Sequence, residues 1–156
     1  MNMISFKDVG IKGFSSNNLG KSTNKIPLGI KTPLEIDQEG KSLFSMHYDL
    51  GSLMDDNLRN LILTNHGERL GLYTFGANLK PLLTDFTNKE DFDTEAMLRI
   101  NTAVSIYLPF VTLIGFESKS DLENNEYTAK IKISVMYSVA SANLNQRMCE
   151  VDLFAI

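Results

Sequence analysis

The sequence predicts an α+β fold in which three helices pack on a small antiparallel sheet of three to four strands. Two periodicities lead to this prediction. Between residues 50 and 108, apolar residues recur every three or four positions, which is typical of amphipathic helices. Between residues 127 and 155 they recur at every second position, which is typical of half-buried strands. Helices followed by a run of neighbouring strands favour a layered α+β arrangement.

Residues 1–40 are predicted to form an extended N-terminal arm and strap, and residues 41–156 the α+β domain. The first 26 or so residues are rich in Gly, Ser, Asn and Lys and show no sustained periodicity. Such a segment buries too little apolar surface to offset its ordering entropy. Two interpretations stay open for it: a solvated tail, or an arm that lies along an acidic neighbouring subunit. Pro27 and Pro33 favour extended backbone in the strap that follows.

The first helix is predicted at residues 53–65, with one apolar face and one polar face. The spacing of Ser52 and Asp55 is typical of an N-terminal capping pair, and Gly67 is expected to provide a left-handed C-terminal cap. The apolar face consists of Leu50, Met54, Leu58, Leu61 and Ile62, and the polar face of Asp55, Asp56, Arg59 and Asn60.

Two further helices are predicted at residues 77–86 and 92–108. Pro81 is tolerated in the second helix because the N–H groups of a first turn have no intrahelical acceptor. The third helix opens with acidic residues, which the helix dipole favours, and it ends at Pro109. Its apolar face consists of Phe92, Ala96, Ile100, Ala103, Val104, Tyr107 and Leu108.

Four strands are predicted, at residues 42–48, 111–116, 127–139 and 148–154. The strand at 127–139 has the clearest pattern, because apolar residues occupy every second position along it. A polar connection at residues 118–126 indicates a hairpin in front of this strand. The last three strands are expected to form one antiparallel sheet, with the helices covering one of its faces.

A glycine-rich corner after the first helix carries the most specific motif of the chain. It contains Gly67-Glu68-Arg69, then Phe75-Gly76, then Asn78-Leu79-Lys80. Together with the preceding helix and the segment Pro27 to Leu34, this corner resembles the baseplate wedge family that serves as sheath initiator in contractile-tailed bacteriophages. Type VI secretion systems and contractile bacteriocins carry relatives of that family. The resemblance covers residues 26–139.

The resemblance implies a structural protein of a phage tail baseplate and not an enzyme. Such a subunit is assembled in the host cytoplasm, resides in the virion and is present in several copies around a ring. The implied partners are other baseplate wedge proteins, the tail sheath protein and the tail tube. The residues implied to hold the fold or to dock wedge proteins are Gly67, Glu68, Arg69, Phe75, Gly76, Pro109 and Phe110.

The third helix departs from the family pattern at its end. Relatives typically close this helix with Glu-Pro-Arg, whereas this chain has Leu108-Pro109-Phe110. The proline matches and the charged pair does not. An apolar contact through Phe110 is therefore expected where relatives use charges.

The strong C-terminal strands suggest how the first sheath ring is templated. A strand at the edge of a sheet presents unpaired N–H and C=O groups, and a sheath subunit can add its own strand to them. The residues expected to lie on the sheath-facing strands are Tyr127, Ile131, Ile133, Val135, Tyr137, Val151 and Leu153.

Two other functions stay open. One is a regulatory binding module of the same fold, as in the bacterial anti-adaptor that blocks delivery of a stress sigma factor to its protease. The other is a peptidoglycan hydrolase, which requires two carboxylates, one of them with a raised pKa. Glu68 together with Asp85 or Asp91 would have to supply them. The structural alternative is that Glu68 makes an ion pair or contacts a helix terminus.

Composition and charge exclude several classes of ligand. A net charge of −4 and a pI near 5.1 disfavour binding to nucleic acid, which needs a basic field. No apolar run reaches the length of a membrane span. One cysteine and two histidines provide neither an internal disulfide nor a Cys/His metal cluster. We therefore expect no cofactor, metal, nucleic acid or membrane among the ligands.

Overall fold

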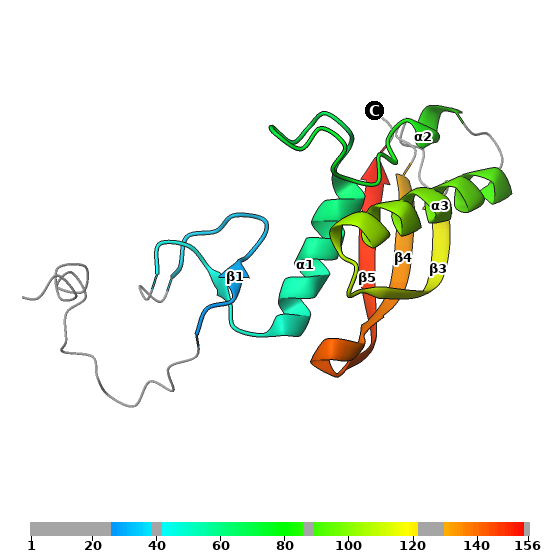
Figure 1. The fold of residues 1–156 in the computed structure, drawn as a ribbon. Coiled ribbons are helices and arrows are strands. Elements are labelled where there is room, and N and C mark those ends of the chain that lie inside the picture. The colour runs from blue at the N-terminus through cyan, green and yellow to red at the C-terminus, as the bar shows by residue number, and fades with distance from the viewer. Residues whose placement is uncertain (1–25, 39–41, 86–88, 122–129, 155–156) are drawn as a thin grey trace, which may run out of the picture.

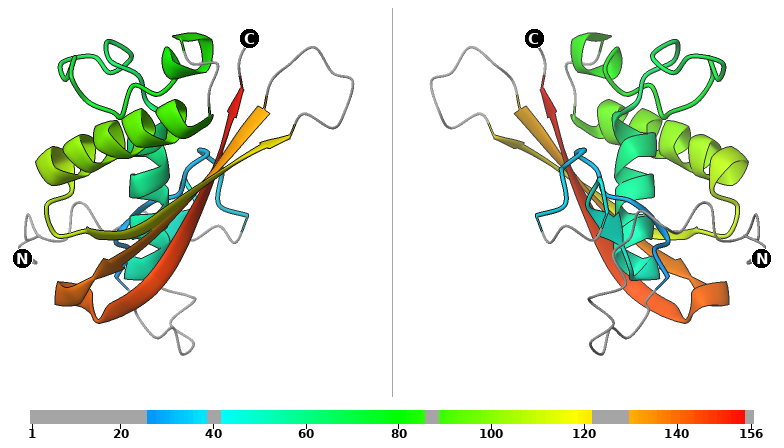
Figure 2. Two further views of the ribbon diagram at one scale, coloured as in Figure 1. Left: turned by 90° about the vertical axis from the view of Figure 1, so that its right-hand side faces the viewer. Right: turned by 90° about the vertical axis from the view of Figure 1, so that its left-hand side faces the viewer.

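A computed structural model describes residues 26–38, 42–85, 89–121 and 130–154, and it confirms the α+β fold (Figure 1). The helices are α1 (Leu50–Leu63), α2 (Leu82–Asp85) and α3 (Lys89–Tyr107). The strands β3 (Thr112–Asp121), β4 (Lys130–Val139) and β5 (Leu144–Phe154) form an antiparallel sheet in the order β3-β4-β5. The helices α1 and α3 lie on one side of this sheet (Figure 2).

Helix α1 begins and ends earlier than predicted. Its N-terminal cap is Asp49 and not Ser52, because the Asp49 carboxylate accepts a hydrogen bond of 2.9 Å from the backbone N–H of Ser52. At the other end the extended backbone of Thr64 terminates the helix. The prediction that Gly67 caps this helix is therefore wrong. The predicted apolar face is confirmed for Met54, Leu58, Leu61 and Ile62, which are buried, but Leu50 at the start of the helix is exposed.

Helix α2 has only four residues, whereas residues 77–86 were predicted to be helical. The reason lies in the end of α1, whose last carbonyl groups have no intrahelical donor. The N–H of Ala77 donates to the Leu61 carbonyl (3.0 Å), and the N–H of Asn78 donates to that of Thr64 (3.3 Å). These bonds hold residues 77–78 against α1, so the chain turns into a helix only after Pro81.

Helix α3 has the predicted apolar face and ends just before Pro109. Phe92, Ala96, Ile100, Ala103 and Val104 are all buried in the core. The helix starts at Lys89, slightly before the predicted position, with Glu90 and Asp91 in its first turn. Within the described ranges, neither α3 nor any other helix combines the length and apolarity that crossing a bilayer requires.

The strap and the short strand at 42–48 pair with each other, which was not predicted. Strands β1 (Gly29–Ile30) and β2 (Met46–His47) form a small antiparallel sheet. Asp56 of α1 fixes this sheet, because it accepts hydrogen bonds from the Thr32 backbone N–H (2.9 Å) and the His47 ring (2.7 Å). Burial alone would raise the pKa of Asp56, but these hydrogen bonds outweigh it and lower the pKa.

The main sheet agrees with the predicted strands, with one extension. β3 continues to Asp121 and so includes residues 118–121, which were expected to belong to a polar hairpin connection. Ser118 explains the extension, since its side chain is buried and its hydroxyl donates to Asp93 of α3. The rest of the connection, residues 122–129 with Tyr127, lies outside the described residues. Along β4 and β5 the predicted alternation is confirmed, with Ile133, Val135, Tyr137, Cys149, Val151 and Leu153 buried.

A single carboxylate joins α1 to two strands of the sheet. The hydroxyl of fully buried Tyr137 donates to Asp55 (2.5 Å), and Arg147 donates to the same carboxylate. Burial, and then the hydrogen bond to Asp55, raise the pKa of Tyr137 above its usual range, so the hydroxyl keeps its proton. The assignment of Asp55 to an outward polar face is therefore wrong: this face of α1 packs on β5.

Replacing Tyr137 by phenylalanine is expected to lower the free energy of unfolding by about 2 kcal/mol, because a buried hydrogen bond to a charged acceptor is lost while the ring is kept. Urea denaturation followed by circular dichroism measures this change. Tyr107→Phe is the matched control, since its hydroxyl meets Thr74 at an exposed position. Equal losses for the two variants would contradict the role assigned to Asp55.

Candidate functional site

The glycine-rich corner forms one wall of a groove of about 660 Å³ at the end of α1. Glu68, Arg69 and Phe75 of the predicted motif all line this groove, together with residues from α1, the strap and the end of α3. The structure therefore brings three of the predicted residues into one site. The full lining consists of Thr32, Asn57, Asn60, Leu61, Thr64, Glu68, Arg69, Phe75, Tyr107 and Leu108.

Glycines give the corner its shape. The backbone of Gly76 has a φ of 110°, and a Cβ there would lie 2.1 Å from the Thr64 carbonyl oxygen. Only glycine permits so close an approach at this angle. Gly67, with a φ of 87°, donates its N–H to the Tyr73 carbonyl (2.8 Å) and closes the loop. Both motif glycines thus determine the backbone conformation of the loop, and only the side chains around them can contact a partner.

The Arg69 side chain is held over an aromatic pair. Its guanidinium lies 4.2 Å from the centre of the Phe75 ring. Phe75 in turn makes an edge-to-face contact with Tyr107, with ring centres 4.9 Å apart. The Tyr107 hydroxyl lies 2.9 Å from the Thr74 hydroxyl. This stack presents a cation and aromatic surface in the groove, although Tyr107 is 32 residues from Phe75 in the sequence.

Glu68 serves the loop as a hydrogen-bond acceptor. Its carboxylate accepts from the backbone N–H of Asn65 (2.8 Å) and from the side-chain amide of the same residue (2.9 Å). These hydrogen bonds lower the pKa of Glu68. A general acid for glycoside hydrolysis requires the opposite shift. Among the residues that line the groove, Glu68 is the only carboxylate, and Asp91 is not in this lining. The side chain of Asp85 lies outside what the structure describes.

Pro109 and Phe110 lie beside the groove and do not line it. Leu108, directly before them, is part of the lining. The Phe110 side chain is 46% exposed, and Ile106 in the last turn of α3 is 63% exposed. The end of α3 therefore presents apolar surface next to the Arg69 stack.

The predicted sheath-facing residues occupy a different part of the molecule, and most of them face inward. β4 is the central strand, so β3 and β5 already pair with its backbone on both sides. The side chains of Ile133, Val135 and Tyr137 are buried, and Ile131 packs against the same core. Residues 130–139 therefore cannot themselves accept a further strand, and the sheath-facing role of the residues named on this strand stays a prediction. Val151 and Leu153 are also buried, but their strand, β5, pairs on one side only among the described residues.

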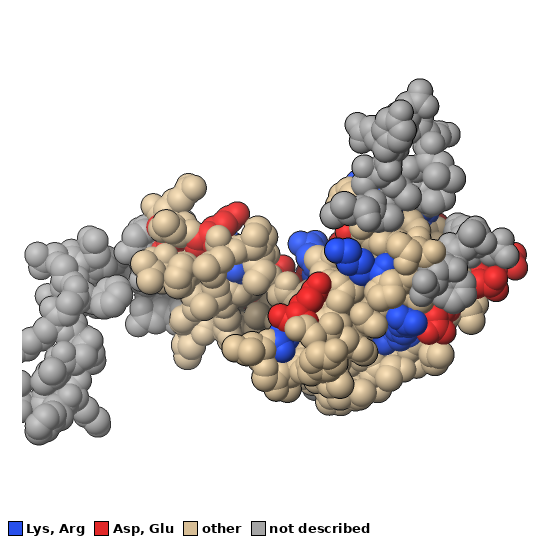
Figure 3. Space-filling model, turned by 90° about the horizontal axis from the view of Figure 1, so that it is seen from above, with Lys and Arg blue, Asp and Glu red and all other residues tan. Residues whose placement is uncertain are grey.

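Charged side chains are dispersed over the upper end of the molecule. Figure 3 shows small separate groups of basic and acidic residues there, with no continuous area of one sign among the described residues in view. Within the described ranges, no cluster of His, Cys, Asp and Glu side chains is arranged to hold a metal ion. The charges in this view therefore indicate neither a uniformly basic nor a uniformly acidic binding surface.

The fold is similar to those of two solved structures. No protein-family model matches this sequence, and no curated protein does. A proposed tail lysozyme from Geobacter sulfurreducens superposes with a TM-score of 0.54 and 15% identity, over 69% of this chain and 93% of that one. A chain in the 6-fold symmetrised cryo-EM structure of the anti-feeding prophage baseplate superposes with a TM-score of 0.52 and 13% identity, over 81% of this chain and 82% of that one. At these identities the likeness is one of fold.

Gly76→Ala is expected to lower the free energy of unfolding by at least about 3 kcal/mol, because the new methyl group meets a backbone carbonyl in a left-handed conformation. Gly71→Ala is the matched control. Its φ is 82°, but no atom lies within 4 Å of a Cβ there. This variant should cost only about 1 kcal/mol. Thermal and urea denaturation measure both, and equal costs would show that the contact with Thr64 is not what requires glycine.

Proposed function

We propose that this chain is a structural baseplate subunit of a contractile tail, of a phage or of a related injection system, that templates the first sheath ring. The observation that carries the proposal is the fold likeness to a chain of the anti-feeding prophage baseplate, which extends over 81% of this chain. The 6-fold symmetry of that assembly supports several copies arranged around a ring. The motif residues that line one groove support the same reading.

The proposed mechanism of templating is strand addition to the β3-β4-β5 sheet. Main-chain hydrogen bonds give affinity in this mode, and a ring of equivalent sites adds avidity. Because β4 is central, the accepting strand is β3 or β5. A sheath strand added at either edge leaves the core between sheet and helices untouched.

The groove at the corner is the proposed docking site for other wedge proteins. Arg69 and Phe75 give it a cation on an aromatic base, and Phe110 adds exposed apolar surface beside it. Aromatic and arginine side chains in such settings commonly provide much of the binding energy of an interface. The replacement of the family's charged pair by Leu108 and Phe110 is consistent with a more apolar partner at this position.

A peptidoglycan hydrolase is the second candidate, favoured by the fold likeness to a proposed tail lysozyme. The lowered pKa of Glu68 and the absence of a second carboxylate among the residues lining its groove argue against it. We expect the purified wild-type chain to release no soluble fragments from cell-wall substrate. Lysis by the wild-type chain that disappears in Glu68→Gln would move the assignment to the hydrolase.

The wedge-docking site can be tested with Phe110→Asp in a tail gene cluster that lacks the native gene. The variant should fold, because the side chain is half exposed, and its yield of sheathed tails in electron micrographs should fall by about tenfold or more, as expected for loss of an interface anchor. Met97→Asp is the control, since Met97 is 51% exposed in the middle of α3. Normal tails with the Phe110 variant would contradict docking at this surface.

A further inference from the structure

Each of the two outer strands of the sheet has one register shift against β4. β3 has a register shift between Leu113 and Gly115, which leaves Ile114 as an extra residue. Such bulges interrupt the ladder and are a common way to block pairing at an edge. β5 has its own shift beside the turn, between Leu144 and Arg147. Beyond these shifts, β3 pairs regularly from Gly115 to Asp121 and β5 from Arg147 to Phe154. The regular part of β5 is the part that lies beside α1.

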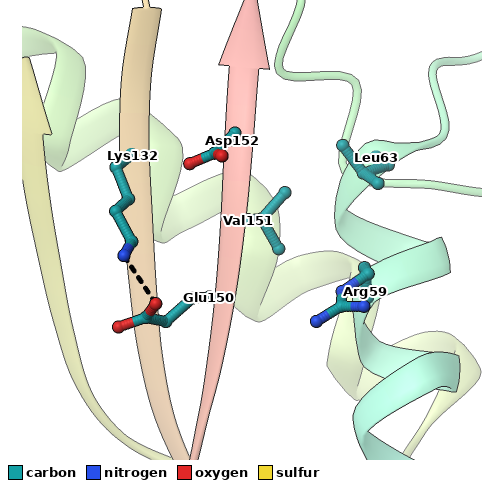
Figure 4. Close-up of a pocket in the computed structure, with 6 residues that line it drawn as sticks. All are labelled: Arg59, Leu63, Lys132, Glu150, Val151 and Asp152. Atoms are coloured by element: carbon teal, nitrogen blue, oxygen red, sulfur yellow. Dashed lines mark ion pairs between the residues drawn. The ribbon is translucent and has the colours of Figure 1, made fainter. Parts of the chain in front are cut away.

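A groove of about 320 Å³ lies between β5 and α1 (Figure 4). Arg59 and Leu63 of α1 form one wall, and the side chain of Val151 points toward them from β5. Leu63 is 42% exposed although it belongs to an otherwise well-packed helix. The edge of β5 that is unpaired among the described residues thus faces this groove, and the opposite wall carries the cationic side chain of Arg59 and the apolar side chain of Leu63.

The acidic side chains in this groove are already neutralised. Glu150 pairs with Lys132 (2.6 Å) and Asp152 with Lys130 (3.1 Å) across the β4–β5 pair. Both pairs lie on the face of the sheet that the helices do not cover. Neither carboxylate of β5 is therefore available to pair with a positive charge on α1.

Arg59 has no ion-pair partner among the described residues. Asp55, one turn earlier on α1, is engaged by Arg147 and Tyr137. On the sheet, Arg59 acts on the thiol of Cys149 and would lower its pKa, but burial outweighs this effect and raises the pKa of the thiol to about 11. The thiol is therefore neutral at physiological pH. The groove keeps one positive charge that nothing described in this chain neutralises.

The spacing along α1 matches that of a strand. Arg59 and Leu63 are four residues apart, which is about 6 Å along a helix, and alternate residues of a strand are about 6.7 Å apart. α1 runs in the same direction as β5, with Asp55 against Arg147 near its start and Leu63 near Asp152 at its end. A strand added to β5 would thus have two side chains on the face toward α1, two positions apart in its sequence. One of them would lie opposite Arg59 and the other opposite Leu63.

We propose that β5 is the accepting edge and that Arg59 selects an incoming strand of a tail protein carrying a carboxylate two positions from an aliphatic side chain. This inference rests on the proposed strand addition and adds the edge and the sequence preference. The carboxylate pairs with Arg59, and the aliphatic side chain covers Leu63. The main-chain bonds to β5 are independent of sequence, so the preference comes from α1.

The probe is a library of random ten-residue peptides displayed on a carrier and selected on the immobilised full chain. Peptides with Asp or Glu two positions from Val, Ile or Leu should be enriched about fivefold or more, as expected for a partly exposed ion pair with an apolar contact. On Arg59→Glu the preference should change to Lys or Arg, because the charge to be matched is reversed. Lys119→Glu, on exposed β3, is the control and should keep the wild-type preference.

Hydrogen exchange locates the bound peptide. Slower exchange in residues 147–154 supports the proposal, and protection confined to residues 112–119 overturns it. It is also overturned if no motif is enriched or if the wild-type chain and Arg59→Glu select the same peptides. A dimer in light scattering that Arg59→Glu dissociates overturns it as well, since a second copy would then occupy β5. Sheath addition to β5 without an acidic preference leaves the proposed function standing and removes Arg59 selection. If the chain selects acidic peptides but is not incorporated into tails, the Arg59 selection stands and the proposed function is removed.

Discussion

The arrangement of this molecule depends on the carboxylate of Asp55. This side chain accepts hydrogen bonds from Tyr137 of β4 and Arg147 of β5, and it thereby sets the position of α1 against the sheet. A buried hydroxyl and a partly buried guanidinium would each be unfavourable without such a partner. The end of α1 in turn carries the glycine-rich corner, and its flank forms one wall of the groove beside β5. Both candidate interfaces are thus fixed by the same contact.

The local features of the fold could be predicted from the sequence because they follow from periodicity. The apolar faces of α1 and α3 and the alternation in β4 and β5 are properties of neighbouring residues. The partners of Asp55 lie 82 and 92 residues away, and no local pattern connects them. The short α2 has a similar cause, since the N–H groups of Ala77 and Asn78 are taken by carbonyls of a different helix.

The candidate sites were predictable to different degrees. Glu68, Arg69 and Phe75 meet in one groove because a short loop brings them together. Tyr107 and Leu108 come from the end of α3, and the periodicity that placed them on an apolar face did not indicate that they reach the corner. Alternation in a strand identifies its buried face but not its neighbours in the sheet. Strand order made β4 central, and so the residues chosen from its pattern proved to be interior. The groove at Arg59 was missed for the same reason, since a helix and a strand far apart in sequence form it.

The regular pairing of β5 with β4 from Arg147 to Phe154 has a kinetic meaning for assembly. A strand that arrives at β5 finds a template that is already rigid, with its core closed on the other side of the sheet. Nearly all of the ordering entropy of the encounter then falls on the arriving segment, which has to straighten before it can pair. The rate of nucleation would thus reflect how often that segment is extended in solution, and each copy around a ring would start growth independently of its neighbours.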